Sequence, residues 1–401
     1  MITTAGLFTL LGTLSSVTAF VDLVESSTPS CGSAEFPFEK ADGTMGTGAD
    51  ALSFHILSNT ATGEKVEIIW QLGGKTERAL LRSPTTGLLR DVLQTHEGNA
   101  TAVRANSHWA GAQLLPFANR IANGTYDFFG HTYHLPNNEV TPGVRSDALH
   151  GFLFNRSLET RGISCSNESG VPAIHLTLGY RFEADDTTPG WPFKLDVAIT
   201  YSLSAGALTI TTRATSLEAS HAVPWFNSWH PYFAVGDVSQ ARVEFDKCTP
   251  DWHASAPAQW SHITMGPGAP KLGDLIPTGA ATPWTAFDGE TPLGGTETVP
   301  TYMDDEFKSL LPNSASVIAA CGLWYKQRIH DQGGDKATLV LFADRQHPVF
   351  QIYTGARETW GWKAIALEPM SALADAYNNG DGLTVLWPGE VFEGAFGLGI
   401  E

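Results

Sequence analysis

The sequence has few basic residues and no apolar stretch long enough to cross a membrane. Its 24 Lys and Arg residues face 42 Asp and Glu residues, which gives a net charge of -18 at pH 7. Such a chain is a poor partner for nucleic acids and for anionic membrane surfaces, because both repel negative charge. No apolar run approaches the roughly 20 residues that a membrane-spanning helix requires. The composition therefore favours a neutral ligand.

Cysteines are also few, and their spacing excludes the common cysteine sites. None of the four forms a C-x-x-C pair, so neither a zinc site nor a dithiol redox site is predicted. In an exported chain, two disulfides could form in any of three connectivities. The four residues are Cys31, Cys165, Cys248 and Cys321. No H-x-x-x-H or similar spacing predicts a metal site elsewhere.

Few stretches show the apolar periodicity of a helix, whereas an alternating pattern of apolar and other residues is common. Apolar residues alternate with others in three consecutive stretches, residues 174–182, 193–203 and 208–212. Such alternation is typical of strands with one buried face. Shorter β-like runs occur at 54–56, 66–70, 338–341 and 349–353. Asp304–Leu311 could form a short helix. The chain is therefore predicted to be all-β, with antiparallel strands.

The N-terminal residues are typical of a secretory signal. An apolar run from Ala5 to Leu14 is followed by Val17-Thr18-Ala19, which fits cleavage after Ala19 and a signal peptide at 1–19. Residues 20–50 are polar and contain several Pro and Gly residues, so we expect an extended lead-in with little regular structure. Residues 51–401 are predicted to form one domain. The Gly- and Pro-rich stretch 254–301 is expected to be an elaborated loop region within it.

Four N-glycosylation sequons agree with export, since each has the form Asn-x-Ser/Thr. They begin at Asn99, Asn123, Asn155 and Asn167. We therefore expect a secreted, extracellular glycoprotein.

One acid stands alone in apolar surroundings near the C-terminus. Glu368 is flanked by Leu367, Pro369 and Met370. Desolvation would raise the pKa of this carboxyl unless a donor offsets it, and a general base is tuned in this way. The alternative is a structural glutamate that caps a turn. Because a base has to be ionised at rest, we expect a donor such as Arg120 to keep the pKa of Glu368 below the working pH.

An imidazole lies upstream, within the aromatic block of residues 225–233. Pro231 cannot donate to a β-ladder, so it marks a strand end and leaves His230 where a ligand could reach it. With an ordinary pKa of about 6.5, histidine is the side chain best suited to exchange a proton at working pH. A histidine packed in an aromatic core is the alternative interpretation.

Taken together, these stretches resemble the aldose 1-epimerase (galactose mutarotase) family. Its members carry an Asn-x-x-His-x-Tyr-Phe segment with the acid histidine and a late Glu-Pro-Met segment with the base glutamate. Segments of the form Asp-Ala-Phe/Tyr-Asn, Gly-Asp-Gly and Pro-Gly-Glu follow. The matching pieces here are Asn227–Phe233, Glu368–Met370, Asp375–Asn378, Gly380–Gly382 and Pro388–Glu390.

The resemblance implies a galactose mutarotase-like supersandwich, which is a large antiparallel β-sandwich. It also implies cofactor-free interconversion of the α and β anomers of a free hexose of the glucose or galactose type. By this resemblance Glu368 is the base for the anomeric hydroxyl, and His230 is the acid for the ring oxygen. We expect no metal, no nucleic acid or membrane partner, and a monomer or weak dimer.

The same resemblance predicts which residues hold the sugar. Arg120 lies in an Asn-Arg-Ile segment, although a lone Arg among apolar residues is more readily the partner of a buried acid. Asp304 is favoured over Asp305 by its spacing from Phe307. The aromatic residues would offer a ring face to the sugar. The predicted substrate-binding residues are Asn119, Arg120, His150, Trp229, Asp304 and Tyr353, with Trp225 as a further aromatic candidate.

Three other functions remain open. A glycoside hydrolase would need two carboxylates about 5–9.5 Å apart, which Glu368 and Asp304 could supply. A sugar-binding protein without catalysis would keep the aromatic residues, but the presence of both proton-transfer residues argues against it. A hexose-6-phosphate 1-epimerase would want a basic cluster for the phosphate, and the arginines that follow Arg120 are scattered.

Overall fold

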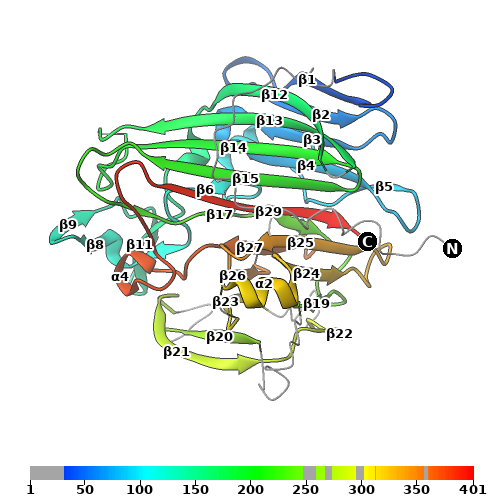
Figure 1. Ribbon diagram of the computed structural model, residues 1–401. Coiled ribbons are helices and arrows are strands. Elements are labelled where there is room, and N and C mark those ends of the chain that lie inside the picture. The colour runs from blue at the N-terminus through cyan, green and yellow to red at the C-terminus, as the bar shows by residue number, and fades with distance from the viewer. Residues whose placement is uncertain are drawn as a thin grey trace.

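A computed structural model describes residues 31–168, 170–185, 187–246, 259–266, 273–294, 302–311, 313–355 and 360–401. The predicted signal peptide, the first part of the lead-in and Cys248 lie outside these ranges. Strands dominate the fold, and the helices are short (Figure 1). The prediction of an all-β chain is therefore confirmed. None of the helices in the described ranges is long and apolar enough to cross a membrane.

Three sheets contain most of the strands. The five-stranded sheet has the order β1 (Phe38–Met45), β2 (Leu52–Asn59), β3 (Lys65–Ile69), β4 (Lys75–Arg82) and β5 (Leu89–Asp91). The nine-stranded sheet has the order β12 (Glu159–Glu168), β13 (Val171–Phe182), β14 (Leu195–Ser204), β15 (Ala207–Ser216), β29 (Val391–Ile400), β25 (Thr338–Asp344), β24 (Trp324–His330), β19 (Arg242–Glu244) and β22 (Asp288–Pro292).

The eight-stranded sheet carries most of the predicted site residues. Its order is β21 (Pro277–Trp284), β20 (Trp260–Met265), β23 (Asp304–Ser309), β26 (Val349–Tyr353), β27 (Ala364–Met370), β17 (Ser228–Trp229) and β6 (Gln113–Leu114), with β18 (Tyr232–Ala234) also beside β27. Figure 1 shows β12–β15 above β29 and β25, and β20–β22 at the opposite end of the molecule.

Smaller sheets and short helices complete the described part of the chain. The small sheets are β10 (Glu139–Thr141) with β11 (Arg145–Leu149) and β7 (Arg120–Ile121), β8 (Thr125–Phe128) with β9 (His131–His134), and β16 (Val223–Trp225) with β28 (Thr384–Leu386). The helices are α1 (Ala100–Ala105), α2 (Ala315–Cys321) and α4 (Ala376–Asn379). Short 3-10 turns are η2 (Gly48–Asp50), η3 (Trp70–Leu72), η4 (Ala122–Gly124) and η5 (Leu153–Asn155).

The alternating stretches form the long antiparallel strands that they predict. In β14 every second side chain is buried, from Leu195 to Leu203, while the intervening ones are partly exposed. The strand β14 pairs along its full length with β13 on one side and with β15 on the other, both antiparallel. The tight turn from β14 to β15 has Gly206 at φ +76°, a conformation that costs glycine least. One face of this sheet therefore supplies much of the core.

Three local predictions are wrong. The lead-in is not without structure, because Phe38–Met45 pairs with β2 and buries Phe38 and Met45. Asp304–Leu311 is not a helix: Asp304–Ser309 pairs with β26 on one side and β20 on the other. The stretch 254–301 is not only loop, since it contains β20, β21 and β22. In each case pairing with a neighbouring strand outweighs local composition.

One disulfide is described. Cys31 and Cys165 are bonded, with Cα atoms 5.6 Å apart. The bridge ties the start of the described chain to β12. This pair is one that the predicted connectivities allow, and Cys248 lies outside the described residues.

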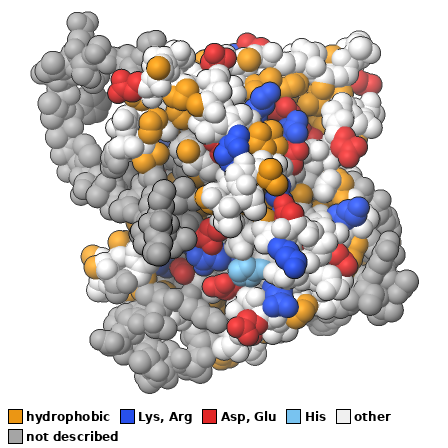
Figure 2. All heavy atoms as spheres, turned by 90° about the vertical axis from the view of Figure 1, so that its right-hand side faces the viewer, with side chains coloured by type: hydrophobic (Ala, Val, Ile, Leu, Met, Phe, Trp, Pro, Cys, Tyr) orange, Lys and Arg blue, Asp and Glu red, His pale blue; other side chains and the backbone are white. Residues whose placement is uncertain are grey.

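The face seen in Figure 2 is the side on which β5 and the C-terminus lie in Figure 1. Asp and Glu side chains are interspersed there with Lys and Arg side chains. The net charge of -18 therefore does not form one continuous acidic patch on this face.

Candidate active site

Strand register brings the predicted acid and base together. Across the sheet, Glu306 of β23 pairs with Gln351 of β26, which pairs with Glu368 of β27. Directly opposed residues share one face of a sheet, so these side chains form a polar row. The segment from β17 to β18 runs antiparallel to β27, with Ser228 opposite Met370 and Tyr232 opposite Ala366. This pairing places His230 beside Glu368.

His230 and Glu368 form a buried pair. The His230 Nε2 and Glu368 Oε1 atoms are 3.3 Å apart, and the two residues are only 5% and 2% exposed. Glu368 Oε2 and His230 Nδ1 have no hydrogen-bond partner within the described residues. Each group therefore has one buried polar atom whose hydrogen-bonding capacity is unused within the described residues.

Burial shifts the pKa values of this pair in opposite directions. Desolvation lowers the pKa of His230 to about 3, with a smaller contribution from His108. Desolvation, reinforced by Asp304, raises the pKa of Glu368 well above its ordinary value, although Arg120 opposes the shift. The expectation that a donor keeps the pKa of Glu368 low is therefore wrong, because the guanidinium of Arg120 is hydrogen-bonded elsewhere. The apolar surroundings make Glu368 a stronger base and His230 a stronger acid.

Arg120 is fixed by an acid that the sequence analysis missed. Its Nε and Nη2 donate to the two carboxylate oxygens of Glu139 at 2.6 and 2.9 Å, and its Nη1 donates to Asn119 Oδ1 at 3.1 Å. A guanidinium has five N–H groups, so one remains on each of Nη1 and Nη2. Nη2 also lies 3.9 Å from Asp304 Oδ2. Arg120 thus has both a structural partner and donors to spare.

Asp304, rather than Asp305, belongs to this cluster. Asp304 Oδ1 accepts a hydrogen bond of 2.6 Å from Gln351 Nε2, and Gln351 Oε1 accepts one of 3.3 Å from Asn119 Nδ2. Asp305 points to the other face and lies 2.8 Å from His262. Burial raises the pKa of Asp304 to about 6, against the opposing charge of Arg120. The alternation of side chains along β23 therefore resolves the choice between the two acids.

His150 is held in a single tautomer by the backbone. Its Nδ1 accepts a hydrogen bond of 3.2 Å from the Asn119 N–H, so the neutral ring carries its proton on Nε2. Burial, together with His230 and Arg120, lowers the pKa of His150 well below its ordinary value, so the ring is neutral. Asn119 and His150 both have positive φ, +51° and +65°. Such conformations are costly for residues other than glycine and recur at functional sites.

Steric crowding requires glycine at the position after His150. Gly151 has a φ of +67°, and a Cβ atom there would lie 2.2 Å from the carbonyl oxygen of Leu115. Only glycine fits this position without displacing the backbone. The His-Gly pair therefore fixes the direction from which His150 enters the site.

The aromatic predictions have mixed outcomes. Tyr353 lies on the face of the site, half-buried beside Tyr232, whose ring stacks on His230 at 5.0 Å. Trp229 does not belong to the site, because it is fully buried, stacks on Phe396 and donates to the Gly111 carbonyl at 3.2 Å. Trp225 is likewise fully buried, against Phe392. Trp229 directly precedes His230 in an extended segment, so the two side chains point to opposite faces.

Three site residues were missed, namely Gln351, Glu139 and Glu306. Gln351 is the only polar residue between Val349 and Ile352, which is a signal that could have found it. Glu306 is fully buried and accepts from the Ala374 N–H at 2.8 Å, and burial raises its pKa to about 8. Neither Glu139 nor Glu306 carries a local signal. No group of acidic, histidine and cysteine side chains in the described ranges is arranged to hold a metal ion.

Comparisons with known proteins find similarity in sequence and in fold. The family model for aldose 1-epimerase matches residues 79–259. Human galactose mutarotase is 29% identical over 187 residues, which are 46% of this chain and 46% of that protein. The match thus spans just under half the length of this relative.

Two solved structures share the fold over most of both chains. A galactose mutarotase-like protein from Clostridium acetobutylicum has 18% identity and a TM-score of 0.66, covering 90% of this chain and 98% of the other. Galactose 1-epimerase from Lactobacillus acidophilus has 16% identity and a TM-score of 0.65, covering 91% and 99%. At such low sequence identity, the structural similarity is evidence for the supersandwich fold alone. Over these ranges the chain is similar in sequence to members of the aldose 1-epimerase family, and it shares the fold of galactose mutarotase-like proteins.

Proposed function

We propose that the protein interconverts the α and β anomers of a free hexose by acid–base ring opening and reclosure. The observation that carries this proposal is the buried contact of 3.3 Å between Glu368 and His230. A base and an acid in one dry site are what the reaction requires, because one proton leaves the anomeric hydroxyl while another reaches the ring oxygen. Each such transfer typically contributes about 10²–10⁴-fold in rate.

In the proposed first step, ionised Glu368 takes the proton from the hydroxyl on C1. The C1–ring oxygen bond breaks, a C1 carbonyl forms, and protonated His230 gives its proton to the ring oxygen. Rotation about C1–C2 turns the other carbonyl face toward the hydroxyl. The reverse transfers close the ring as the other anomer and return both protons, so no cofactor is consumed.

Burial favours this chemistry because the transfers remove charge from the pair. In the reactive form Glu368 is negative and His230 positive, and burial makes this form less populated than the neutral pair. After ring opening both groups are neutral. Desolvation penalises charged forms, and it acts on both groups, raising the pKa of Glu368 and lowering that of His230. The proton shared by the pair is conserved over the cycle, so the buried pair never carries a net charge.

The remaining polar atoms would orient the sugar hydroxyls. Arg120 offers one N–H on each terminal nitrogen, His150 offers Nε2–H, and Asp304 offers carboxylate oxygens. Tyr353 lies on the same face, opposite Asp304 in the strand register. Fixing several hydroxyls at once holds C1 and the ring oxygen near the two proton-transfer groups, and such positioning lowers the barrier.

A neutral hexose fits the charges of the site better than a hexose 6-phosphate. The guanidinium of Arg120 is bound by Glu139, and Arg145 lies 3.1 Å from the same carboxylate. Both arginines are therefore already paired with a negative group. The paired carboxylate offsets their positive charge, so the site offers little net attraction for a phosphate.

Polarimetry tests the proposal. Freshly dissolved α-glucose and α-galactose should reach anomeric equilibrium faster with the purified protein than without it, in proportion to protein concentration. Neutral oligosaccharides should release no monosaccharide, because no second carboxylate is assigned to bond cleavage. Release of monosaccharide would instead support a hydrolase, and unchanged optical rotation kinetics with both sugars would reject the proposal.

We also propose that the protein is exported and glycosylated. The disulfide between Cys31 and Cys165 is typical of an oxidising compartment. The asparagine of each predicted sequon is exposed, so a glycan attached to it would extend into solvent. These residues are Asn99, Asn123, Asn155 and Asn167.

Mass spectrometry of the protein recovered from the medium checks this proposal. We expect the chain to lack residues 1–19 and to carry an N-glycan on at least one of the four asparagines. Treatment with a peptide N-glycosidase should then lower the mass. An intact N-terminus and an unmodified mass would contradict the proposal.

A further inference from the structure

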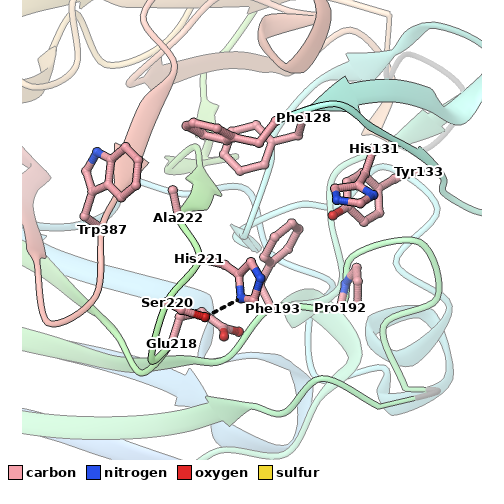
Figure 3. A pocket seen from close by; sticks show the side chains of 11 residues that line it. Phe128, His131, Tyr133, Pro192, Phe193, Glu218, Ser220, His221, Ala222 and Trp387 are labelled. Carbon is pink, nitrogen blue, oxygen red and sulfur yellow. Dashed lines mark hydrogen bonds between the residues drawn. The ribbon is translucent and has the colours of Figure 1, made fainter.

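A cavity of about 290 Å³ lies apart from the site around Glu368 and His230 and shares no residue with it. It is lined by the β8–β9 hairpin, the segment around Phe193, residues 218–222 and Trp387 in the turn between β28 and β29. Figure 3 shows aromatic and imidazole rings on several sides of it, with Ser220 and Glu218 at one edge. These elements come from distant parts of the sequence, so the cavity depends on the complete fold.

Two exposed aromatic side chains meet at this cavity. Phe129 is 62% exposed and Trp387 is 48% exposed, and they are the two aromatic residues among the large exposed hydrophobic side chains of the described ranges. Their ring centroids are 5.4 Å apart at an interplanar angle of 74°. Leaving such rings in water sacrifices hydrophobic free energy. Their convergence on one cavity indicates a ligand with an apolar face.

The backbone holds Phe129 there at a conformational cost. Phe128 pairs with His131, so Phe129 and Gly130 are the two loop residues of the β8–β9 hairpin. Both have positive φ, +47° and +81°. Asparagine and glycine are the residues favoured in such loops, and a bulky side chain at positive φ is rare. A strained phenylalanine that remains exposed is poorly explained by folding and suggests a role in binding.

Polar groups at the edge provide the complementary contacts. Ser220 Oγ and His221 Nδ1 are 3.1 Å apart, and both residues are exposed (Figure 3). Glu218 Oε1 accepts from the Lys194 N–H at 2.7 Å, while its Oε2 has no hydrogen bond to any described residue. The lining contains no Lys or Arg side chain, so an anionic ligand would find no counter-charge. A neutral ligand with hydroxyl groups can use the serine, the imidazole and the carboxylate together.

We propose that this cavity binds one pyranose unit of a neutral oligosaccharide, independently of the catalytic site. A pyranose has a C–H face that packs on aromatic rings and an edge of hydroxyls that needs donors and acceptors. Small-molecule sites typically have volumes of about 300–1,000 Å³, so a cavity of about 290 Å³ suits a single sugar ring better than a peptide helix. The other sugar units of the oligosaccharide would extend into solvent.

The test uses cellohexaose, maltohexaose and mannohexaose whose reducing ends have been converted to alditols. These probes have no terminal anomeric hydroxyl, so they are not substrates for the proposed mutarotation. Calorimetric titration and saturation-transfer NMR of the full chain should detect binding of at least one probe. Trp387→Ala and Phe129→Asn should each raise its Kd at least about tenfold, or 1.4 kcal/mol, while the anomerisation rate stays unchanged.

The Phe129→Asn variant separates binding from folding. Asparagine tolerates positive φ better than phenylalanine. The melting temperature of the Phe129→Asn variant should therefore equal or exceed that of the wild type. Leu88→Ala, at a residue 70% exposed and outside the cavity, is the matched control and should keep the wild-type Kd. The proposal is overturned if the wild type binds none of the probes or if both cavity variants keep full affinity. A concentration-dependent dimer that both variants abolish, without sugar binding, would assign the cavity to a second copy of the chain.

Discussion

Glu368→Gln is expected to lower kcat for mutarotation at least about 100-fold, while the Kd for the sugar changes by less than about tenfold. Glutamine keeps the shape of the side chain and most of its hydrogen bonds, but it cannot accept the proton of the anomeric hydroxyl. A loss confined to kcat identifies an interaction made only in the transition state. Polarimetry gives kcat, and calorimetric titration at equilibrium gives the Kd.

Glu306→Gln provides the matched control. On the face of the sheet that carries Glu368, Glu306 lies opposite Gln351, and Gln351 lies opposite Glu368. Because its pKa is about 8, its carboxyl is already largely neutral at pH 7, and glutamine preserves both charge and shape. This variant should therefore keep kcat within a few-fold of the wild type. If Glu368→Gln retained turnover, the base would have to lie elsewhere, and Asp304 would be the next candidate.

The long strands could be predicted from the sequence, whereas their short neighbours could not. The strands β13, β14 and β15 are each ten or more residues long, and buried side chains alternate with less buried ones over most of each strand, so burial of one face dictates the structure. In β23 three consecutive acids conceal the period, although Asp304 and Glu306 are buried and Asp305 is only partly so. Only the neighbouring strands β20 and β26 decide that this segment is extended. The β1 strand was missed for the same reason, since its pairing partner β2 is what orders it.

The site was predicted where a residue stands out from its neighbours and missed where it does not. Glu368 and His230 are isolated polar residues in apolar or aromatic segments, and the structure brings them within 3.3 Å. Glu139 lies in a polar segment, so nothing in the sequence indicates that it binds Arg120 through two hydrogen bonds. Trp229 was included because it adjoins His230 in sequence. Neighbours along an extended chain point to opposite faces, and this rule would have excluded it.

His230→Asn is expected to preserve the fold and to lower kcat at least about 100-fold. Asparagine is smaller and polar, and its side chain does not exchange protons at working pH. Without the imidazolium, the ring oxygen has to take its proton from water as the C1–ring oxygen bond breaks. Because the side chain of His230 is almost fully buried, circular dichroism and the melting temperature should accompany the kinetics, so that a loss of packing is recognised.

The pH profile distinguishes a proton donor from a packing residue. The working form of the pair holds one shared proton. Burial lowers the pKa of His230 to about 3, and below that pH a second proton binds to the pair, so that neither group can act as the base. Above the raised pKa of Glu368 the shared proton is lost, so that neither group can act as the acid. The acid limb of kcat/KM then belongs to His230 and the alkaline limb to Glu368, the reverse of what ordinary pKa values would give. In His230→Asn the limb that belongs to His230 is lost, and the residual rate should rise with pH as Glu368 ionises. An unchanged bell-shaped profile, or near-normal turnover, would remove His230 from the mechanism.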